Sequence, residues 1–158
     1  MNQEVKIQII DGEYKYIAAC TEILQNSELG KVYFSDTQKA INMLEYAIEK
    51  KELHISLNEQ DECVGFIYCM PNGVFGSYPY LHIISVKEDC RGNGIGRLLM
   101  SYFEDRYPSE KYFLTVDDFN IKAKKLYERL GYQCDEQLPD FYKKGIDCYL
   151  MMKKRYLK

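Results

Sequence analysis

The chain has 158 residues, 46% of them apolar, which is enough for one hydrophobic core and short for two ordinary domains. Its 21 basic and 24 acidic side chains give a net charge of -3, which excludes the basic excess that binding to nucleic-acid phosphates requires. The sequence carries neither a signal-peptide pattern nor an 18-residue apolar run, so we expect a soluble, cytoplasmic, single-domain protein over residues 1–158, without a membrane partner.

The amino-terminal third predicts a strand followed by two helices. VKIQII at residues 5–10 is rich in β-branched side chains, which is typical of a strand. Residues 13–26 carry apolar side chains at helical spacing, and we expect Gly30 to end this helical region. The run 35–38 has the form of a capping box with Ser35 as the cap, and it predicts a second helix from about Asp36 to Lys50.

The middle of the chain predicts three consecutive strands and a third helix. Residues 53–57 and 63–70 are apolar runs around a polar turn, which is typical of a β-hairpin. Proline and glycine punctuate residues 71–79 and predict a loop. YLHIISV at residues 80–86 is a further strand. After a glycine cluster, apolar side chains at helical spacing continue to just before Pro108.

The carboxy-terminal third predicts a strand, a helix and two final strands. Residues 112–116 have the apolar pattern of a strand and residues 120–130 that of a helix, while the last two strands enclose a loop at residues 139–145. The predicted order is therefore βααβββαβαββ. Strands and helices that interleave in this way imply an α/β fold, with a central mixed sheet and helices on both faces.

A glycine-rich turn, Arg91–Gly96 (RGNGIG), lies between the strand ending at Val86 and the next helix. The first amides of a helix lack partners within the helix and the dipole favours negative charge, so a turn at this position can bind phosphate. A P-loop would need Lys-Ser/Thr after its second glycine, and a dinucleotide fingerprint would need a glycine in place of Arg97. Both nucleotide motifs are excluded, whereas a connection without a ligand stays open on the turn alone.

Two patterns in this half of the chain agree with each other. Arg91, Gly94 and Gly96 match Q/R-x-x-G-x-G/A in full, and residues 120–132 match N-x-x-A-x-x-L-Y-x-x-x-G-F/Y. They resemble motifs A and B of the GCN5-related N-acetyltransferase (GNAT) superfamily, and the resemblance covers roughly residues 80–132. It implies the fold of that family and an acetyl-CoA-dependent transfer of an acetyl group to a primary amine by direct attack on the thioester.

The resemblance also implies which residues contact acetyl-CoA. The segment 84–86 resembles the family's fourth strand, where a bulge is expected to free a backbone amide for the thioester, and the glycine turn would hold the pyrophosphate. Asn120 has the position of an N-cap and, by resemblance, also contacts the pantetheine arm. Arg97 or a lysine of the following helix would meet the 3'-phosphate. The implied cofactor-binding residues are Ile84, Val86, Arg91, Gly92, Asn93, Gly94, Ile95, Gly96, Arg97, Asn120 and Tyr127.

Tyr127 has two interpretations. On a helix that begins near Asn120, it shares an apolar stripe with Ala123, Leu126 and Leu130, so the helix alone favours a core tyrosine. The resemblance instead implies that its hydroxyl donates a hydrogen bond to the departing sulfur. A tyrosine pKa of about 10 lies above the thiol value of about 8.5, so a stabilising hydrogen bond is favoured over full proton donation.

Some group must take a proton from the acceptor amine, since an alkylamine with a pKa of about 10.4 is mostly protonated at neutral pH. His82 lies four residues before Val86, at a position that holds a general base in several members of the family. Imidazole suits this role because its ordinary pKa is close to neutral. A packing histidine on an apolar strand is the alternative, and Tyr80, two residues earlier on the same face, is the reserve base.

The sequence leaves the acceptor open between a small amine and a protein or peptide amine. Residues 140–151 resemble the final loop and strand of family members that acetylate protein N-termini, through an aromatic-x-x-x-G-x-D-x-x-x-M arrangement. Tyr33, Phe34 and Tyr142 are the expected substrate-binding residues. The 15 tyrosines could pack in a core or at a subunit interface, so the sequence allows a homodimer.

A catalytically silent module that binds acyl-CoA and reports it to a partner is the alternative function. Such a module would need motif A but neither Tyr127 nor His82, and both are present. No metal is expected, because the six cysteines form no C-x-x-C pair and the two histidines lie far apart in the sequence. We expect the cysteines to be free thiols.

Overall fold

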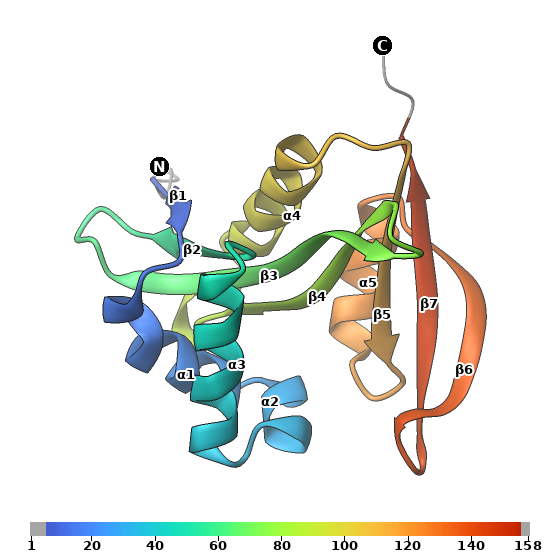
Figure 1. Ribbon diagram of the computed structural model, residues 1–158, viewed down its shortest axis with the longest axis horizontal. Helices are drawn as coiled ribbons and strands as arrows, with labels where there is room; N and C mark the ends of the chain where they lie inside the picture. Colours follow the sequence, from blue (N-terminus) through green and yellow to red (C-terminus); the bar gives the residue numbers. More distant parts are fainter. Residues whose placement is uncertain (1–5, 156–158) are drawn as a thin grey trace. The chain divides into compact units, whose positions relative to one another are not determined.

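The structure is a computed structural model that describes residues 6–155 (Figure 1). Its strands form a seven-stranded sheet in the order β1-β2-β3-β4-β5-β7-β6. β4 and β5 pair in parallel, whereas β1 pairs with β2, β2 with β3, β5 with β7 and β6 with β7 in the antiparallel direction. Helices flank this mixed sheet, which confirms the predicted α/β fold class.

Seven strands were predicted and seven are found in the described chain, together with one more α-helix than expected. The strands are β1 Gln8–Asp11, β2 Leu53–Leu57, β3 Cys63–Val74, β4 Tyr78–Val86, β5 Lys111–Asp117, β6 Gln133–Lys143 and β7 Ile146–Lys154. The α-helices are α1 Ile17–Gln25, α2 Glu28–Tyr33, α3 Thr37–Glu49, α4 Ile95–Arg106 and α5 Ile121–Arg129, and the 3-10 turns are η1 Tyr14–Tyr16 and η2 Glu88–Cys90.

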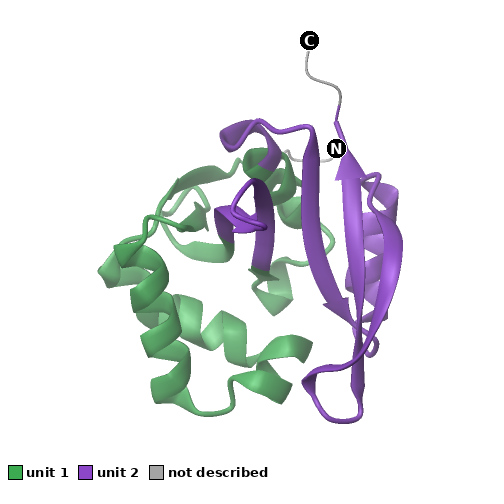
Figure 2. Ribbon diagram, turned by 45° about the vertical axis from the view of Figure 1, so that its right-hand side comes forward, with its two compact units in different colours: residues 1–68, 83–103 green, residues 69–82, 104–158 purple. Residues whose placement is uncertain are grey.

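The chain divides into two compact units (Figure 2). Unit 1 comprises residues 1–68 and 83–103, and unit 2 comprises residues 69–82 and 104–158. β3, β4 and α4 contribute residues to both units. The single domain predicted from chain length stays a prediction.

Unit 1 has a core formed by β2, the first part of β3 and the helices α1 and α3. All five residues of β2 are buried, as expected for a strand whose two faces are both covered. Leu24 of α1, Leu44 of α3 and Phe66 of β3 have no exposed surface. The helical spacing of apolar residues in α1 and α3 therefore reflects the faces that these helices bury.

Unit 2 is organised around β5, which pairs with β4 and with β7. Tyr112 and Leu114 of β5 and Met151 of β7 are completely buried. The Tyr112 hydroxyl donates to the carbonyl oxygens of Glu104 and Tyr107, at 2.8 and 2.9 Å. β6 is exposed along almost its whole length, so β5 and β7 supply most of the buried surface of the strands in this unit.

Three predictions in the amino-terminal region need correction. Gly30 does not end a helix but lies inside α2, whose start is capped by Ser27: the Ser27 hydroxyl accepts from the Gly30 amide at 2.9 Å. The cap of α3 is Asp36 rather than Ser35, because the Asp36 carboxylate accepts from the Lys39 amide at 3.1 Å. The predicted first strand begins only at Gln8, and its first residue, Val5, lies outside the described residues.

The two predicted loops are shorter than expected. β3 continues through Pro71 to Val74 and β4 starts at Tyr78, with Phe75 and Gly76 at φ values of 54° and 65° in the turn. Two consecutive positive φ values are typical of a tight hairpin turn, which explains why the strands extend beyond the proline. β6 likewise continues through Pro139 to Lys143, so the predicted loop at 139–145 is mostly strand.

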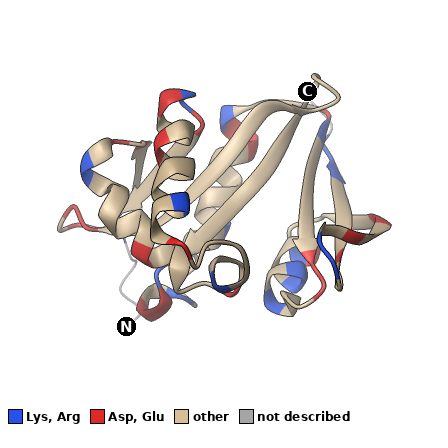
Figure 3. Cartoon of the chain, turned by 60° about the horizontal axis from the view of Figure 1, so that its bottom comes forward, with Lys and Arg blue, Asp and Glu red and all other residues tan. Residues whose placement is uncertain are grey.

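Charged residues of both signs lie on helices and loops, and basic residues gather on α5 (Figure 3). Across residues 6–155, no helix combines the length and apolarity that crossing a membrane would require.

Candidate functional site

In unit 1, hydrogen bonds from two side chains brace the glycine turn between β4 and α4. The Arg91 guanidinium Nε donates to the carbonyl oxygen of Val86 at 3.2 Å, which ties the turn to the end of β4. The Asn93 amide Nδ2 donates to the carbonyl oxygen of Cys90 at 3.1 Å. The turn is therefore held in shape by its own side chains, and its backbone faces solvent, since residues 91–94 are exposed.

Glycine is required in this turn by backbone conformation. Gly92 and Gly94 have φ values of 84° and 80°, which a residue with a Cβ rarely adopts. A Cβ built on either glycine meets no atom within 4 Å, so open space lies above both. The Leu98 amide donates to the Gly94 carbonyl oxygen at 3.0 Å, and the amides of Ile95 to Arg97 precede this first helical bond. An open glycine turn that leads into the first amides of a helix suits an anion such as a pyrophosphate.

β4 presents one half-exposed face and one buried face. Tyr80, His82, Ile84 and Val86 are partly exposed, and the residues between them are buried. This alternation runs from Tyr78 to Val86 without a break, so the burial pattern shows no interruption where a bulge was expected at residues 84–86. Pairing with β5 consists of Tyr80 with Phe113 and Leu81 with Leu114, and it ends before His82.

In unit 2, three hydroxyl groups form what we call the hydroxyl cluster: Tyr80 of β4, Thr115 of β5 and Tyr142 of β6. The Tyr80 hydroxyl lies 2.8 Å from Thr115 Oγ1 and 3.1 Å from the Tyr142 hydroxyl, and Thr115 Oγ1 lies 3.4 Å from the Tyr142 hydroxyl. Tyr142 is 51% exposed, so the cluster reaches the surface. The structure thus brings the reserve base Tyr80 to the expected substrate-binding residue Tyr142.

His82 lies beside this cluster, with its ring centroid 6.1 Å from that of Tyr80. Burial lowers the pKa of His82 from its ordinary value, because the charged imidazolium is less well solvated there. Burial has the opposite effect on a phenol and raises the pKa of Tyr80 well above its usual range. At neutral pH His82 is therefore a neutral acceptor of protons, whereas Tyr80 stays protonated.

An excursion of β6 delivers Tyr142 to the cluster. The register of β6 with β7 shifts between Leu138, which pairs with Cys148, and Lys143, which pairs with Ile146, so residues 139–142 bulge out of the ladder. Asp140 has a φ of 48°, and its amide donates to the Asp147 carboxylate at 3.1 Å. The Asp140 carboxylate in turn accepts from the Gly145 amide. Gly145 has a φ of 88°, which favours glycine, and Asp147 supplies the accepting carboxylate, so both residues of the tail pattern help to shape this excursion.

On α5, Tyr127 is 6% exposed, with its ring 6.2 Å from that of Tyr132. It belongs to the buried face, as the apolar stripe predicted. No hydrogen bond to its hydroxyl is found among residues 6–155, and burial raises the pKa of that hydroxyl above its usual range. Tyr127 is therefore a phenol with a donor to offer, and not an acid at neutral pH.

Asn120 occupies the N-cap position of α5, as predicted, but its side chain makes no capping hydrogen bond. Among the basic residues of this helix, Lys124 forms an ion pair with Glu128, with 3.4 Å between Nζ and Oε1. Its Nζ also lies 4.4 Å from the centroid of the Tyr149 ring. Lys122 and Lys125 are exposed. The side-chain amide of Asn120 is thus available at the start of α5, and the two lysines are available on the outer face of the helix.

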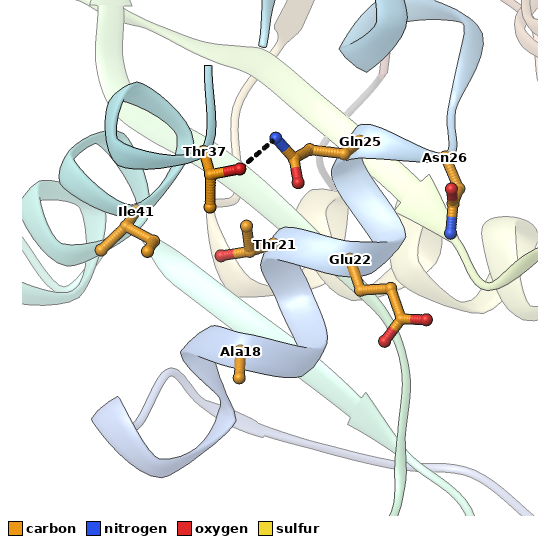
Figure 4. Close-up of a pocket in the computed structure, with 7 residues that line it drawn as sticks. All are labelled: Ala18, Thr21, Glu22, Gln25, Asn26, Thr37 and Ile41. Atoms are coloured by element: carbon orange, nitrogen blue, oxygen red, sulfur yellow. Dashed lines mark hydrogen bonds between the residues drawn. The ribbon is translucent and has the colours of Figure 1, made fainter. Parts of the chain in front are cut away.

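The other expected substrate-binding residues, Tyr33 and Phe34, lie in unit 1 at the end of α2. Gln25 of α1 donates from Nε2 to the Phe34 carbonyl oxygen at 3.0 Å and to Thr37 Oγ1 at 3.1 Å. Gln25 also lines a pocket between α1 and α3 (Figure 4), which has a volume of about 330 Å³. Its lining residues are Ala18, Thr21, Glu22, Gln25, Asn26, Thr37 and Ile41, and so do not include Tyr33 or Phe34.

Thr115 is the one member of the hydroxyl cluster that sequence reasoning missed. It lies 35 residues from Tyr80 and 27 from Tyr142, so no local pattern relates it to either. Within the described part of the chain, no group of three or more histidine, cysteine or acidic side chains is placed to hold a metal ion.

The comparison with known protein families identifies the family of this chain. A model described as the acetyltransferase (GNAT) family matches residues 17–132, well over half of the chain. The chain belongs to this family.

Three relatives of this GNAT protein illustrate the range of the family. It is 40% identical over 80 residues to the uncharacterized N-acetyltransferase MJ1530 of Methanocaldococcus jannaschii, a match covering 47% of this chain and 51% of that protein. It is 28% identical over 111 residues to the 5-NmdU N-acetyltransferase of Pseudomonas phage PaMx11, covering 70% and 78%. It is 33% identical over 93 residues to human N-alpha-acetyltransferase 30, covering 55% and 25%. The chain thus spans about half of the first relative and a quarter of the third.

Solved structures show the same fold over nearly the whole GNAT chain. Ard1 from Thermoplasma volcanium superposes with a TM-score of 0.78 at 21% identity, covering 96% of this chain and 99% of that one. The NatC complex bound to Gag peptide and CoA contains a chain with a TM-score of 0.75 at 18% identity, covering 96% and 99%. The structure of yncA from Salmonella typhimurium with its cofactor acetyl-CoA gives 0.71 at 18% identity, covering 97% of both chains.

The position of Tyr142 should depend on Asp147. Replacing Asp147 with Ala removes the acceptor for the Asp140 amide and for Gln137 Nε2, which donates to Asp147 at 2.9 Å. A hydrogen bond to a charged group contributes about 1.5–3 kcal/mol, so amide hydrogen exchange in residues 140–143 should accelerate roughly tenfold or more. Asp135→Ala, an exposed position on the same strand, is the control and should leave exchange unchanged. Equal protection in both variants would mean that the excursion does not depend on Asp147.

Proposed function

We propose that this GNAT protein is an acetyl-CoA-dependent N-acetyltransferase whose acceptor is the α-amino group of a protein or peptide. Family membership and the open, anion-accepting glycine turn support the donor. The acceptor is supported by the tail pattern that delivers Tyr142, together with similarity to human N-alpha-acetyltransferase 30 and to the fold of the peptide-bound NatC complex. The phage relative, named 5-NmdU N-acetyltransferase, keeps an acceptor other than a peptide as the competing assignment.

On the donor side, backbone amides at the glycine turn would recognise the negative charge of acetyl-CoA. The amides of Ile95, Gly96 and Arg97 would bind the pyrophosphate of acetyl-CoA, and the exposed Arg97 would add a cation. Ile84 and Val86, on the half-exposed face of β4, would contact the thioester and its pantetheine arm. Asn120 and the exposed lysines of α5 are the further donor contacts that the family resemblance implies.

On the acceptor side, the reaction forms a C–N bond and breaks the C–S bond, and the amine must lose a proton. A peptide α-amine has a pKa of about 8, so roughly a tenth of it is already neutral at pH 7. His82, held neutral by burial, accepts the proton directly or through water, which leaves the amide product. Tyr80 is the weaker candidate for this step, because burial holds it as a phenol.

Tyr127 would stabilise the leaving sulfur. Its hydroxyl carries a proton at neutral pH and has no hydrogen-bond partner among residues 6–155, so it can donate to a developing thiolate without giving up the proton. The thiolate then takes a proton from solvent to give free CoA, and His82 releases its proton to solvent, which balances the reaction. A silent acyl-CoA-binding module would have no use for this phenol or for a neutral imidazole on β4.

Acetyl transfer to a defined set of amines tests the function. We expect thiol release from acetyl-CoA with a peptide that has a free α-amine, and none with the same peptide when its α-amine is blocked and only a lysine amine is available. Spermidine and an aminoglycoside complete the set as small acceptors. Transfer to these alone would contradict the peptide assignment, and binding of acetyl-CoA without transfer to any amine would favour the silent module.

Gly94→Val should greatly weaken acetyl-CoA binding, because a branched side chain would occupy the open space above the turn and disfavour its positive φ. We expect a loss of about a hundredfold or more in affinity by calorimetry, equivalent to about 2.7 kcal/mol. Gly76→Val is the matched control, since Gly76 also has a positive φ and open space but lies in the β3–β4 hairpin. If the two variants bind acetyl-CoA equally well, the turn is not the donor site.

His82→Ala should slow the reaction and remove the acidic limb of the pH profile. Only neutral imidazole accepts a proton, so kcat/KM of the parent should fall as the pH drops through the pKa of His82. Because burial lowers that pKa, the limb should lie below pH 6.5. It is thereby separated from the ionisation of a peptide α-amine near 8. The same peptide must serve both proteins, and a variant that keeps both the rate and the limb would identify His82 as a packing residue.

A further inference from the structure

The hydroxyl cluster contains a residue with no role in the mechanism so far. Thr115 is half-buried on β5, and its Oγ1 is within 2.8 Å of the Tyr80 hydroxyl and 3.4 Å of the Tyr142 hydroxyl. Tyr80 and Tyr142 are themselves 3.1 Å apart. The three oxygens therefore form a closed triangle to which three different strands contribute one side chain each.

We propose that Thr115 is a positioning residue for the acceptor: its hydroxyl holds Tyr80 and Tyr142 in one arrangement that receives the N–H groups of the amine. This inference rests on the proposed function, because it concerns the acceptor side of the same reaction. It differs from that function in assigning a role to a residue that need not touch the reacting atoms.

The protons and lone pairs of the three hydroxyl groups determine what the hydroxyl cluster can bind. Each hydroxyl has one proton and two lone pairs, so three mutual contacts use all three protons within the triangle. Tyr80 and Thr115 then each keep a lone pair that the triangle does not use. A ligand that complements these atoms must donate hydrogen bonds, and a primary amine or its ammonium form does so with two or three N–H groups. A carboxylate or carbonyl oxygen would find no donor there.

Thr115 is the most rigidly held member of the triangle. Its strand is hydrogen-bonded on both sides, and Thr115 itself is paired with Leu150 of β7. Its β-branched side chain has few rotamers, and χ1 alone places the hydroxyl oxygen. Tyr142, by contrast, projects from the excursion of β6 and is 51% exposed. Without the Thr115 hydroxyl, the long side chain of Tyr142 would lose one of the groups that orient it.

A purely structural role does not explain this arrangement. The triangle opens to solvent at Tyr142, where water would satisfy a hydroxyl as well as another side chain does. It also lies beside His82, the proposed proton acceptor. A fixed set of lone pairs next to a neutral imidazole would hold an amine where its proton can leave, and this is the purpose of preorganisation at a reaction site.

The decisive comparison is Thr115→Val against Thr115→Ser. Valine keeps the shape and the β-branch but removes the hydroxyl, whereas serine keeps the hydroxyl. For a peptide acceptor with a free α-amine, we expect Thr115→Val to raise KM about tenfold, since one hydrogen bond contributes up to about that factor. The KM for acetyl-CoA and the acidic limb due to His82 should not change. Thr115→Ser should stay within about threefold of the parent.

A double variant tests whether the hydroxyls act as a unit. If Thr115 works through Tyr142, then Tyr142→Phe should raise the peptide KM in the parent and have little further effect in Thr115→Val. Two outcomes overturn the proposal: an unchanged peptide KM in Thr115→Val, or a Thr115→Ser variant as impaired as Thr115→Val. Fully additive effects of Thr115→Val and Tyr142→Phe would equally contradict it.

A spectroscopic measurement separates this proposal from the proposed function. With tyrosine labelled by 13C at Cζ, the signals of Tyr80 and Tyr142 report the hydrogen bonds of their hydroxyls without any acceptor. We expect both signals to shift in Thr115→Val and to return toward the parent in Thr115→Ser. Shifts of this kind in a protein that acetylates no amine would count against the proposed function alone. Unshifted signals in Thr115→Val would overturn the role of Thr115 whatever the activity.

Discussion

β5 is hydrogen-bonded on both sides, in parallel to β4 and in antiparallel to β7, and this double pairing sets the register of the acceptor side. Side chains alternate between the two faces of a strand, so a shift of one residue would turn Thr115 to the opposite face. In the observed register, Tyr80 pairs with Phe113 and its hydroxyl reaches Thr115, two residues further along β5. The hydroxyl cluster is thus a consequence of strand register and not of nearness in the sequence.

The two partners of the proposed reaction are recognised by different kinds of group. Backbone amides at the start of α4 would bind the donor, and these depend on side-chain identity only through the positive φ values of Gly92 and Gly94. Side-chain hydroxyls would receive the acceptor, and each can be changed by a single substitution. The fold can therefore keep one donor while its choice of amine changes through a few positions such as Thr115 and Tyr142.

Partial burial places each titratable group in the form that the proposed chemistry uses. Low solvation disfavours a charge of either sign, so it lowers the pKa of His82 and raises the pKa of Tyr80 and Tyr127. At neutral pH the imidazole is then an acceptor of protons and the two phenols remain donors of hydrogen bonds. One physical effect, acting on two kinds of side chain, thus separates the base from the hydrogen-bond donors.

The amino-acid sequence by itself determined the elements that depend on local pattern. Apolar spacing located the seven strands, the helices α3 to α5 and the buried face that holds Tyr127, because hydrophobic periodicity follows from the geometry of each element. The turn Arg91–Gly96 could also be recognised from the sequence, because its glycines are required by the conformation of their own backbone. Similar local rules misplaced the cap of α3, where two adjacent residues can both accept an amide and only the chain's path selects Asp36.

Tertiary structure alone decided how side chains from distant segments meet. Thr115 joins Tyr80 and Tyr142 across 35 and 27 residues, and no spacing in the sequence encodes that contact. The excursion of β6 that carries Tyr142 depends on Asp147 accepting from Asp140 across the hairpin, at a place where prolines and glycines predicted only a loop. Such contacts follow from strand pairing and register, which are properties of the assembled sheet, so the helix and strand periods of a single segment do not contain them.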